Sequence, residues 1–221
     1  AQSREIRVQG CHLSGIRTQP SLVSHSGKPD MIGISFYPLG LYPFLKIPLS
    51  ELTDTTIELE LLNKEFIERV SDQFTTALSI TEKLQILERE LVRILDMQRF
   101  PTQDIVHVVH HFSSSVQTVP IPQLCEISGI HPRTLERRFQ TYVGIRPKLF
   151  QRLTRYQYAL NHIMAEKSPR FTTVAYEYEY YDQAHFIKEF AAFSGCSPSQ
   201  FFQKTDFVRQ IPPTRHTSTE H

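Results

Sequence analysis

Apolar residues recur at helical spacing in two adjacent stretches near the middle of the chain. Spacings of three and four residues place such side chains on one face of a helix, and Ser79 followed by Glu82 fits a capping box. We expect a helical hairpin whose second helix covers residues 80–96. Its apolar faces either close the core of their own domain, the commoner arrangement, or pack on a second copy in a dimer. The two stripes are Phe66, Val70, Phe74 and Leu78, and Leu84, Leu87, Leu91, Ile94 and Leu95.

Short apolar stretches separated by turn residues precede this hairpin. They comprise Leu22 and Val23 and then residues 31–37, with turn residues at Pro20, 26–29 and 38–40. This alternation predicts strands of an irregular sheet. A closed barrel that holds a ligand needs about eight strands, more than roughly fifty residues can supply, so we expect a β-rich region that is only partly barrel-like.

The chain divides into two expected domains and a tail. Residues 97–104 contain Pro101 among polar residues and have the composition of a linker. We predict one domain over residues 1–98, a second over 102–203, and a disordered tail over 204–221, where Pro212 and Pro213 occur without sustained periodicity. The predicted fold class is α+β, with the β-rich region and the hairpin followed by an all-α domain.

The C-terminal half repeats itself, and a repeat is a stronger signal than an isolated motif. Leu124 and Cys125 pair with Val174 and Ala175, and after one extra residue in the second copy the offset stays at 51. Two copies are too few for a solenoid, so a duplicated helical unit is expected. The positions that share this offset are Leu135, Phe139, Gly144, Pro147 and Phe150, which pair with Phe186, Phe190, Gly195, Pro198 and Phe201.

Each copy has the pattern of two helices joined by a tight turn. Gly129 permits the turn in the first copy and Pro132 opens its second helix, while Asp182 is a suitable N-cap in the second copy. The repeated Leu and Phe positions give each second helix one buried face. Because the second helix of such a pair can lie in the major groove, we predict two helix-turn-helix units.

The outward faces of these second helices carry side chains suited to base edges. Arg and Lys pair with guanine, Gln with adenine, Glu with cytosine, and apolar groups with the thymine methyl. His185 is interpreted equally well as a helix-packing residue. The predicted base-contacting residues are Arg133, Thr134, Glu136, Arg137 and Gln140 in the first unit and Gln183, Ala184, His185, Ile187 and Lys188 in the second.

Residues 148–167 contain no Pro or Gly and carry apolar residues at helical spacing, which predicts one helix connecting the two units. Such a helix would hold the units about one DNA turn apart. Basic residues at its start are expected to contact phosphates, which position a protein on DNA without encoding sequence. They are Arg146, Lys148, Arg152 and Arg155.

The charge distribution supports a nucleic-acid partner only weakly. Residues 1–115 hold 11 Lys and Arg against 14 Asp and Glu, whereas residues 116–221 hold 13 against 9. A positive field attracts polyanions, but so small an excess is also typical of a solvated face. The duplicated motif, rather than the charge, favours DNA contact.

Two stretches of the C-terminal half resemble the AraC family. SGIHPRTLERRF at 128–139, followed by VGIRP at 143–147, looks like the first helix-turn-helix unit of that family. YYDQAHFIKEF at 180–190, followed by GCSP at 195–198, resembles the second, including its longer turn. The resemblance covers about residues 102–203 and implies a seven-helix DNA-binding domain of a transcription activator or repressor. Glu179 stands where the family usually has Gly, which predicts a strained or reshaped turn.

The N-terminal region also resembles part of some AraC-family members. Residues 36–54 are similar to the latter part of their cupin-like sensor domain. Only that latter part is found, so a fragment, a processed product and an abbreviated member all stay open. Candidate partners besides double-stranded DNA are an unidentified small-molecule effector of the sensor-like part, a second copy packed on the hairpin, and RNA polymerase, which the family resemblance implies.

No pattern indicates an enzyme, a cofactor or a metal site. His107, His110 and His111 have helical spacing but no evident third ligand, so surface histidines are the favoured interpretation. Glu177, Glu179 and Asp182 fit a helix end better than a catalytic carboxylate pair. Three cysteines, far apart and never in a CxxC pair, indicate reduced thiols. Without a long apolar run or a secretion signal, we expect a cytoplasmic protein with no membrane contact.

The sequence thus favours a DNA-binding transcription regulator with two helix-turn-helix units in successive major grooves. The alternative is an effector-sensing or protein-interaction module whose helical domain binds a protein partner, because the hairpin is amphipathic and the net charge of +1 is modest. Salt dependence separates the two, since DNA binding releases counterions and weakens as salt rises.

Overall fold

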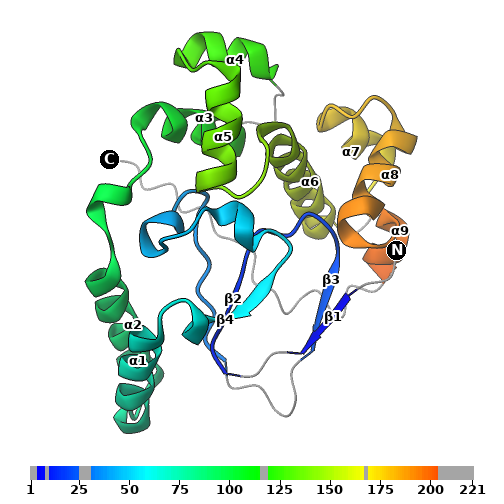
Figure 1. The fold of residues 1–221 in the computed structure, drawn as a ribbon. Coiled ribbons are helices and arrows are strands. Elements are labelled where there is room, and N and C mark those ends of the chain that lie inside the picture. The colour runs from blue at the N-terminus through cyan, green and yellow to red at the C-terminus, as the bar shows by residue number, and fades with distance from the viewer. Residues whose placement is uncertain (1–3, 8–9, 25–30, 115–118, 167–168, 204–221) are drawn as a thin grey trace.

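The computed structural model describes residues 4–7, 10–24, 31–114, 119–166 and 169–203, and it confirms the α+β fold class. Its described strands all lie in the N-terminal part, and helices make up most of the rest (Figure 1). The tail predicted over 204–221 lies outside the described residues. The strands are β1 (Arg4–Arg7), β2 (His12–Ser14), β3 (Ser21–Ser24) and β4 (Thr56–Glu58), and the short 3-10 helices are η1 (Tyr42–Phe44), η2 (Leu49–Leu52), η3 (Leu59–Leu61) and η4 (Met97–Arg99).

The four described strands form two separate pairs. β1 pairs in parallel with β3, which sets Arg4 beside Ser21, and β2 pairs antiparallel with β4, which sets His12 opposite Glu58. The strand expected at Leu22 and Val23 is present as β3, but the one expected over residues 31–37 is wrong. That segment has no described strand beside it to supply backbone partners. Together with the hairpin it lines a cavity of about 1230 Å³ instead.

The predicted hairpin consists of α1 (Lys64–Thr76) and α2 (Ile80–Ile94). The capping box at the start of α2 is confirmed, because the Ser79 side chain accepts from the Glu82 N–H and the Glu82 side chain accepts from the Ser79 N–H. Between the two helices, the buried Glu90 carboxylate accepts a hydrogen bond from Arg69 Nε at 2.9 Å. At the start of α2, Ile80 and Leu84 are at least half exposed, whereas Leu87, Leu91, Ile94 and Leu95 are half-buried.

Seven helices follow in the described ranges up to residue 203, as the family resemblance implied, and they pack into two apolar clusters. The first cluster joins α3, α4 and α5 to the start of α6, and the second joins the rest of α6 to α7 and α8. Figure 1 shows α6 lying between these two groups. The predicted connecting helix is therefore present as a single element. The seven are α3 (Gln103–Ser114), α4 (Ile121–Ser128), α5 (Pro132–Tyr142), α6 (Pro147–Ala165), α7 (Phe171–Glu177), α8 (Gln183–Ser194) and α9 (Pro198–Gln203).

The repeated positions occupy equivalent places in the two groups. Leu135 and Phe139 of α5 have no exposed surface, and neither do their counterparts Phe186 and Phe190 of α8. Gly144 and Gly195, which end the two helices, both have a positive φ, at 99° and 81°. The sequence repeat therefore reflects a duplicated pair of helices.

The N-terminal region packs close to the C-terminal ends of α5 and α8. The Thr53 hydroxyl donates to the Gly144 carbonyl at 2.7 Å, and a β-carbon at Gly144 would lie 2.9 Å from the Leu49 carbonyl oxygen. At the equivalent glycine, Gly195, a β-carbon would lie 3.1 Å from the Pro20 ring. Parts of the N-terminal region therefore lie close to the corresponding glycines of both helix pairs.

Candidate nucleic-acid interface

We call α4 with α5 the first unit and α7 with α8 the second unit, and their turns share one geometry. Each turn contains one left-handed residue, Gly129 directly after α4 with a φ of 66° and Glu179 two residues after the end of α7 with a φ of 53°. The next N–H then donates to the carbonyl five residues earlier, as in a Schellman C-cap. These bonds measure 3.1 Å for Ile130 to Cys125 and 2.9 Å for Tyr180 to Ala175. The strain expected at Glu179 is therefore confirmed, and Tyr181 is the extra residue of the longer second turn.

Replacing Glu179 with glycine is expected to stabilise the protein by about 1 kcal/mol, because glycine adopts a positive φ without the steric cost that other residues carry. The matched control is Gly129→Ala, which imposes that cost on the first turn. A β-carbon there meets nothing within 4 Å, so only backbone strain should act, and we expect a loss of about 1 kcal/mol. Urea unfolding of both variants checks this, and a destabilised Glu179→Gly protein would contradict it.

The outward face of α5 is exposed along its whole length. His131 caps the helix by accepting from the Arg133 N–H at 3.3 Å, and Pro132 occupies the first turn. With Leu135 and Phe139 buried, the opposite face presents four exposed polar side chains. They are Arg133, Glu136, Arg137 and Gln140, while Thr134, also predicted as a contact, is half-buried.

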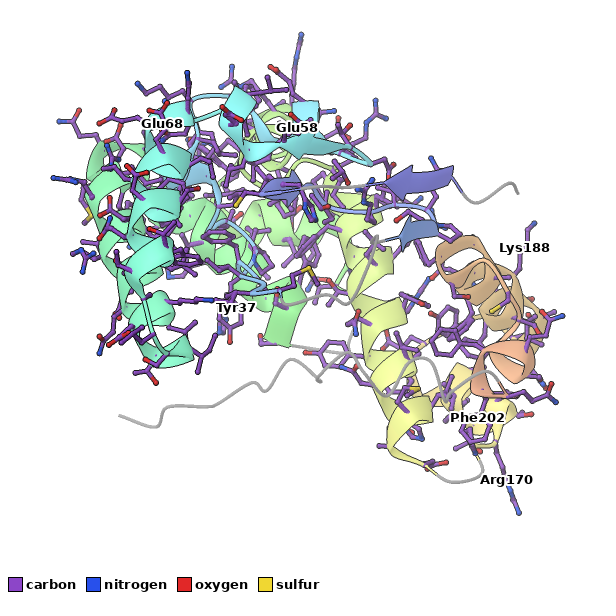
Figure 2. All side chains as sticks on the ribbon, turned by 90° about the horizontal axis from the view of Figure 1, so that it is seen from below. Tyr37, Glu58, Glu68, Arg170, Lys188 and Phe202 are labelled. Carbon is purple, nitrogen blue, oxygen red and sulfur yellow. The ribbon has the colours of Figure 1, made fainter. Side chains whose placement is uncertain are left out.

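The outward face of α8 is shorter and less polar. Asp182 caps the helix by accepting from the His185 N–H at 2.6 Å, and Gln183, Ala184 and Lys188 are exposed. Lys188 points away from the body of the protein, at the end opposite Glu68 of α1 (Figure 2). Ile187 is half-buried against the second apolar cluster, so little of it is left for a base.

The geometry of His185 favours the packing interpretation. Its Nδ1 accepts from the Tyr181 N–H at 3.4 Å, and its ring meets the Tyr180 ring edge-on at 5.5 Å between centroids. Both contacts lie within the turn. His185 therefore helps to shape the start of α8, although its side chain is partly exposed.

The four expected phosphate contacts fall into two groups. Arg146 and Lys148, at the start of α6, are exposed. Arg152 Nε and Arg155 Nη2 instead bind the two carboxylate oxygens of Glu189, at 2.8 and 2.7 Å, and the Arg155 side chain is only 14% exposed. Its guanidinium also lies 4.3 Å from the centre of the Tyr180 ring. Arg155 of α6 is thus held by contacts with the second unit.

The sequence interpretation missed Glu189, which is 4% exposed on the inner face of α8. Its spacing from Phe186 was the available signal, because residues three apart on a helix share a face. Burial of this region also raises the pKa of Tyr180.

The equivalent ion pair of the first unit is more open. Arg138, which matches Glu189 at the offset of 51, binds Asp104 of α3, and the two side chains are 28% and 34% exposed. The Thr102 hydroxyl and the Arg138 guanidinium both lower the pKa of Asp104. The two units therefore use charged residues at the same helical position, with opposite sign and different burial.

Other candidate chemistry finds little support in the described part of the chain. His107 and His110 of α3 are exposed and His111 is half-buried, and no described group of three or more His, Cys, Asp or Glu side chains is arranged to hold a metal ion. Asp182 caps α8, as the helix-end interpretation of the acidic residues required. None of the helices in the described ranges combines the length and apolar character needed to cross a membrane.

Two family models match parts of the chain. Residues 124–204 match a helix-turn-helix domain of the AraC type, and residues 1–58 match a domain of unknown function, DUF6597. No curated protein matches the chain. An apo variant of ToxT from Vibrio cholerae strain SCE256 is similar at 12% identity and a TM-score of 0.42, over 72% of this chain and 62% of the ToxT chain. Residues 124–204 belong to the helix-turn-helix domain of the AraC family of DNA-binding transcription regulators.

Proposed function

We propose that the protein regulates transcription by placing α5 and α8 in successive major grooves of one DNA duplex. The observation that carries this proposal is the equivalence of the two units. Each has a left-handed turn residue, a capped second helix with a fully buried inner face, and an outer face open to solvent. A second helix of this kind is the element that enters the groove in helix-turn-helix proteins.

The length of α6 supports simultaneous contact by both units. It contains 19 residues, and a helix of that length spans about 28 Å. Successive major grooves on one face of DNA lie roughly 34 Å apart. Because α6 packs on both units, it would hold α5 and α8 at a separation of the right order.

The proposed contacts follow from exposure. Arg133, Glu136, Arg137 and Gln140 would read bases from α5, and Gln183, Ala184 and Lys188 from α8. Arg146 and Lys148 would contact phosphates at the start of α6. Thr134, His185 and Ile187 are weaker candidates because of their burial or turn contacts, and we leave Arg152 and Arg155 out because Glu189 binds them.

Arg137→Ala and Lys188→Ala are expected to weaken binding to a specific duplex by about tenfold or more, since one good base contact contributes roughly 1–3 kcal/mol of discrimination. The duplex would be selected by the wild-type protein from a random-sequence library and used in mobility-shift titrations. Each variant should lose base preference only in its own half-site, which is the DNA segment contacted by the helix that carries the substitution. Lys64→Ala on α1, which removes an equally exposed charge far from both units, is the control. Unchanged affinity and preference in both variants would contradict the assignment.

The alternative function, a module that binds a protein partner, is favoured by one observation. Leu78 and Val92 of the hairpin are largely exposed, at 95% and 65%. Titration of duplex DNA against salt separates the two functions, because DNA affinity should fall steeply with rising salt. No detectable DNA affinity at low salt would favour the protein partner.

Further parts of the proposal concern partners and organisation. The cavity between the N-terminal region and the hairpin is lined largely by apolar residues and supports a small-molecule effector. The exposed apolar residues Leu78, Leu84 and Val92 of the hairpin support a homodimer. Contact with RNA polymerase stays a prediction from the family resemblance. We propose that residues 1–98 form the sensor part and residues 102–203 the DNA-binding part.

A further inference from the structure

A buried carboxylate joins the second recognition helix to the connecting helix. Glu189 lies on α8 and is 4% exposed. Its Oε1 accepts from Arg155 Nη2 at 2.7 Å and its Oε2 accepts from Arg152 Nε at 2.8 Å. Both arginines belong to α6, so one side chain makes two charge-assisted hydrogen bonds to the neighbouring helix.

Such a contact restricts the rotation and translation of α8 relative to α6. A carboxylate without partners in an apolar interior is strongly unfavourable, so α8 can bury Glu189 only where both arginines reach it. Apolar packing is non-directional and tolerates small rotations, whereas two hydrogen bonds to fixed donors do not. Rotation or sliding of α8 along α6 would break at least one of them.

The same contact pairs two positive charges with a carboxylate. The Arg155 side chain is only 14% exposed, and the Arg152 side chain, 41% exposed, places its guanidinium 5.4 Å from the centre of the Phe193 ring. Without the carboxylate, these two groups would be free to turn toward a phosphate backbone. That contact would attract any duplex, because phosphate contacts carry no sequence information.

We propose that Glu189 is a positioning residue for sequence recognition: through Arg152 and Arg155 it fixes the angle of α8 on α6 and keeps both arginines from nonspecific phosphate contact. The inference rests on the proposed function, because it assumes that α8 reads DNA. According to this proposal, recognition of the second half-site, the DNA segment that α8 contacts, depends on Glu189 although Glu189 touches no base.

The test is Glu189→Gln, with Asp104→Asn as the matched control. Both changes replace a carboxylate that binds arginine by an isosteric amide, Glu189 on α8 and Asp104 on α3, where it binds Arg138 of the first unit, but only Glu189 is buried. For Glu189→Gln we expect roughly tenfold weaker binding to the selected duplex, the equivalent of one lost base contact, with discrimination reduced at the second half-site alone. Affinity for an unrelated duplex should stay the same or rise. Asp104→Asn should leave second half-site discrimination intact.

This pattern separates positioning from loss of stability. A variant that was merely less stable would bind the selected and the unrelated duplex more weakly in parallel, and that result would overturn the proposal, as would unchanged second half-site discrimination. If Glu189→Gln does not fold, Arg152→Met carries the test. It removes one half-exposed partner and leaves Arg155 on the carboxylate, and it should reduce discrimination at the second half-site without affecting the first.

A DNA-free measurement keeps the inference distinct from the proposed function. Amide hydrogen exchange in α8 should be faster in the variant than in the wild type, while exchange in α5 stays unchanged. Faster exchange in α8 from a protein that selects no duplex would sustain the positioning of α8 and refute the proposed function. Unchanged exchange in α8 would refute the positioning role.

Discussion

Truncating Phe190 to alanine is expected to lower the free energy of unfolding by about 4 kcal/mol, the range measured when a buried aromatic ring is removed. Phe190 has no exposed surface, and its ring lies 5.2 Å from that of Tyr156 and 5.7 Å from that of Phe186. The ring holds α8 against α6. Its loss leaves a cavity at the point where the second unit is attached.

Urea unfolding monitored by circular dichroism measures this loss. Phe139→Ala, at the equivalent position of the first unit, should cost a similar amount, because Phe139 is equally buried and contacts the rings of Phe112 and Phe150. Tyr176→Ala is the control, since that side chain is 89% exposed and its removal should change stability by less than about 0.5 kcal/mol. A loss below about 1 kcal/mol at Phe190 would mean that the second unit is not packed as described.

Gly144→Ala should destabilise the protein by about 3 kcal/mol, because two separate costs act at that position. The residue has a φ of 99°, which other residues rarely adopt, and the added β-carbon would lie 2.9 Å from the Leu49 carbonyl oxygen. The atom in the way belongs to the backbone, so it cannot be relieved by turning a side chain. The N-terminal region would have to move away from the first unit and lose the hydrogen bond from Thr53.

Gly33→Ala is the matched control for this clash. A β-carbon at Gly33 meets nothing within 4 Å, so the change should be close to neutral. Unfolding midpoints give the difference, and limited proteolysis near Thr53 reports whether the N-terminal region has separated. Equal stability of the two variants would show that the N-terminal region does not rest on the first unit in solution.

The helical half of the molecule was predictable because its information is local and repeated. Phe139 and Phe190 share an offset, a helical spacing and complete burial, so one pattern reports both units. Gly129 and Asp182 mark a turn and a helix start through backbone preferences that hold in any context. The strain at Glu179 was expected instead from the family resemblance, because the family usually has Gly at that turn position.

The missed features depend on partners far away in sequence. Arg155 and Glu189 are 34 residues apart, and neither residue alone indicates that the other buries it. Charge and helical spacing therefore suggested a phosphate contact where the folded chain has an ion pair. The prediction of a strand over residues 31–37 was wrong for a similar reason. An apolar stretch forms a strand only where a neighbouring strand supplies hydrogen-bond partners.

The most direct test of the two-unit account is a chemical footprint of the wild-type protein on a duplex that it has selected from random sequence. The account predicts two protected major-groove segments on one face of the DNA, with centres separated by about one helical turn, or roughly 10 base pairs. Arg137→Ala should remove protection and preference in one segment and Lys188→Ala in the other. A single protected segment that both substitutions weaken alike would contradict it.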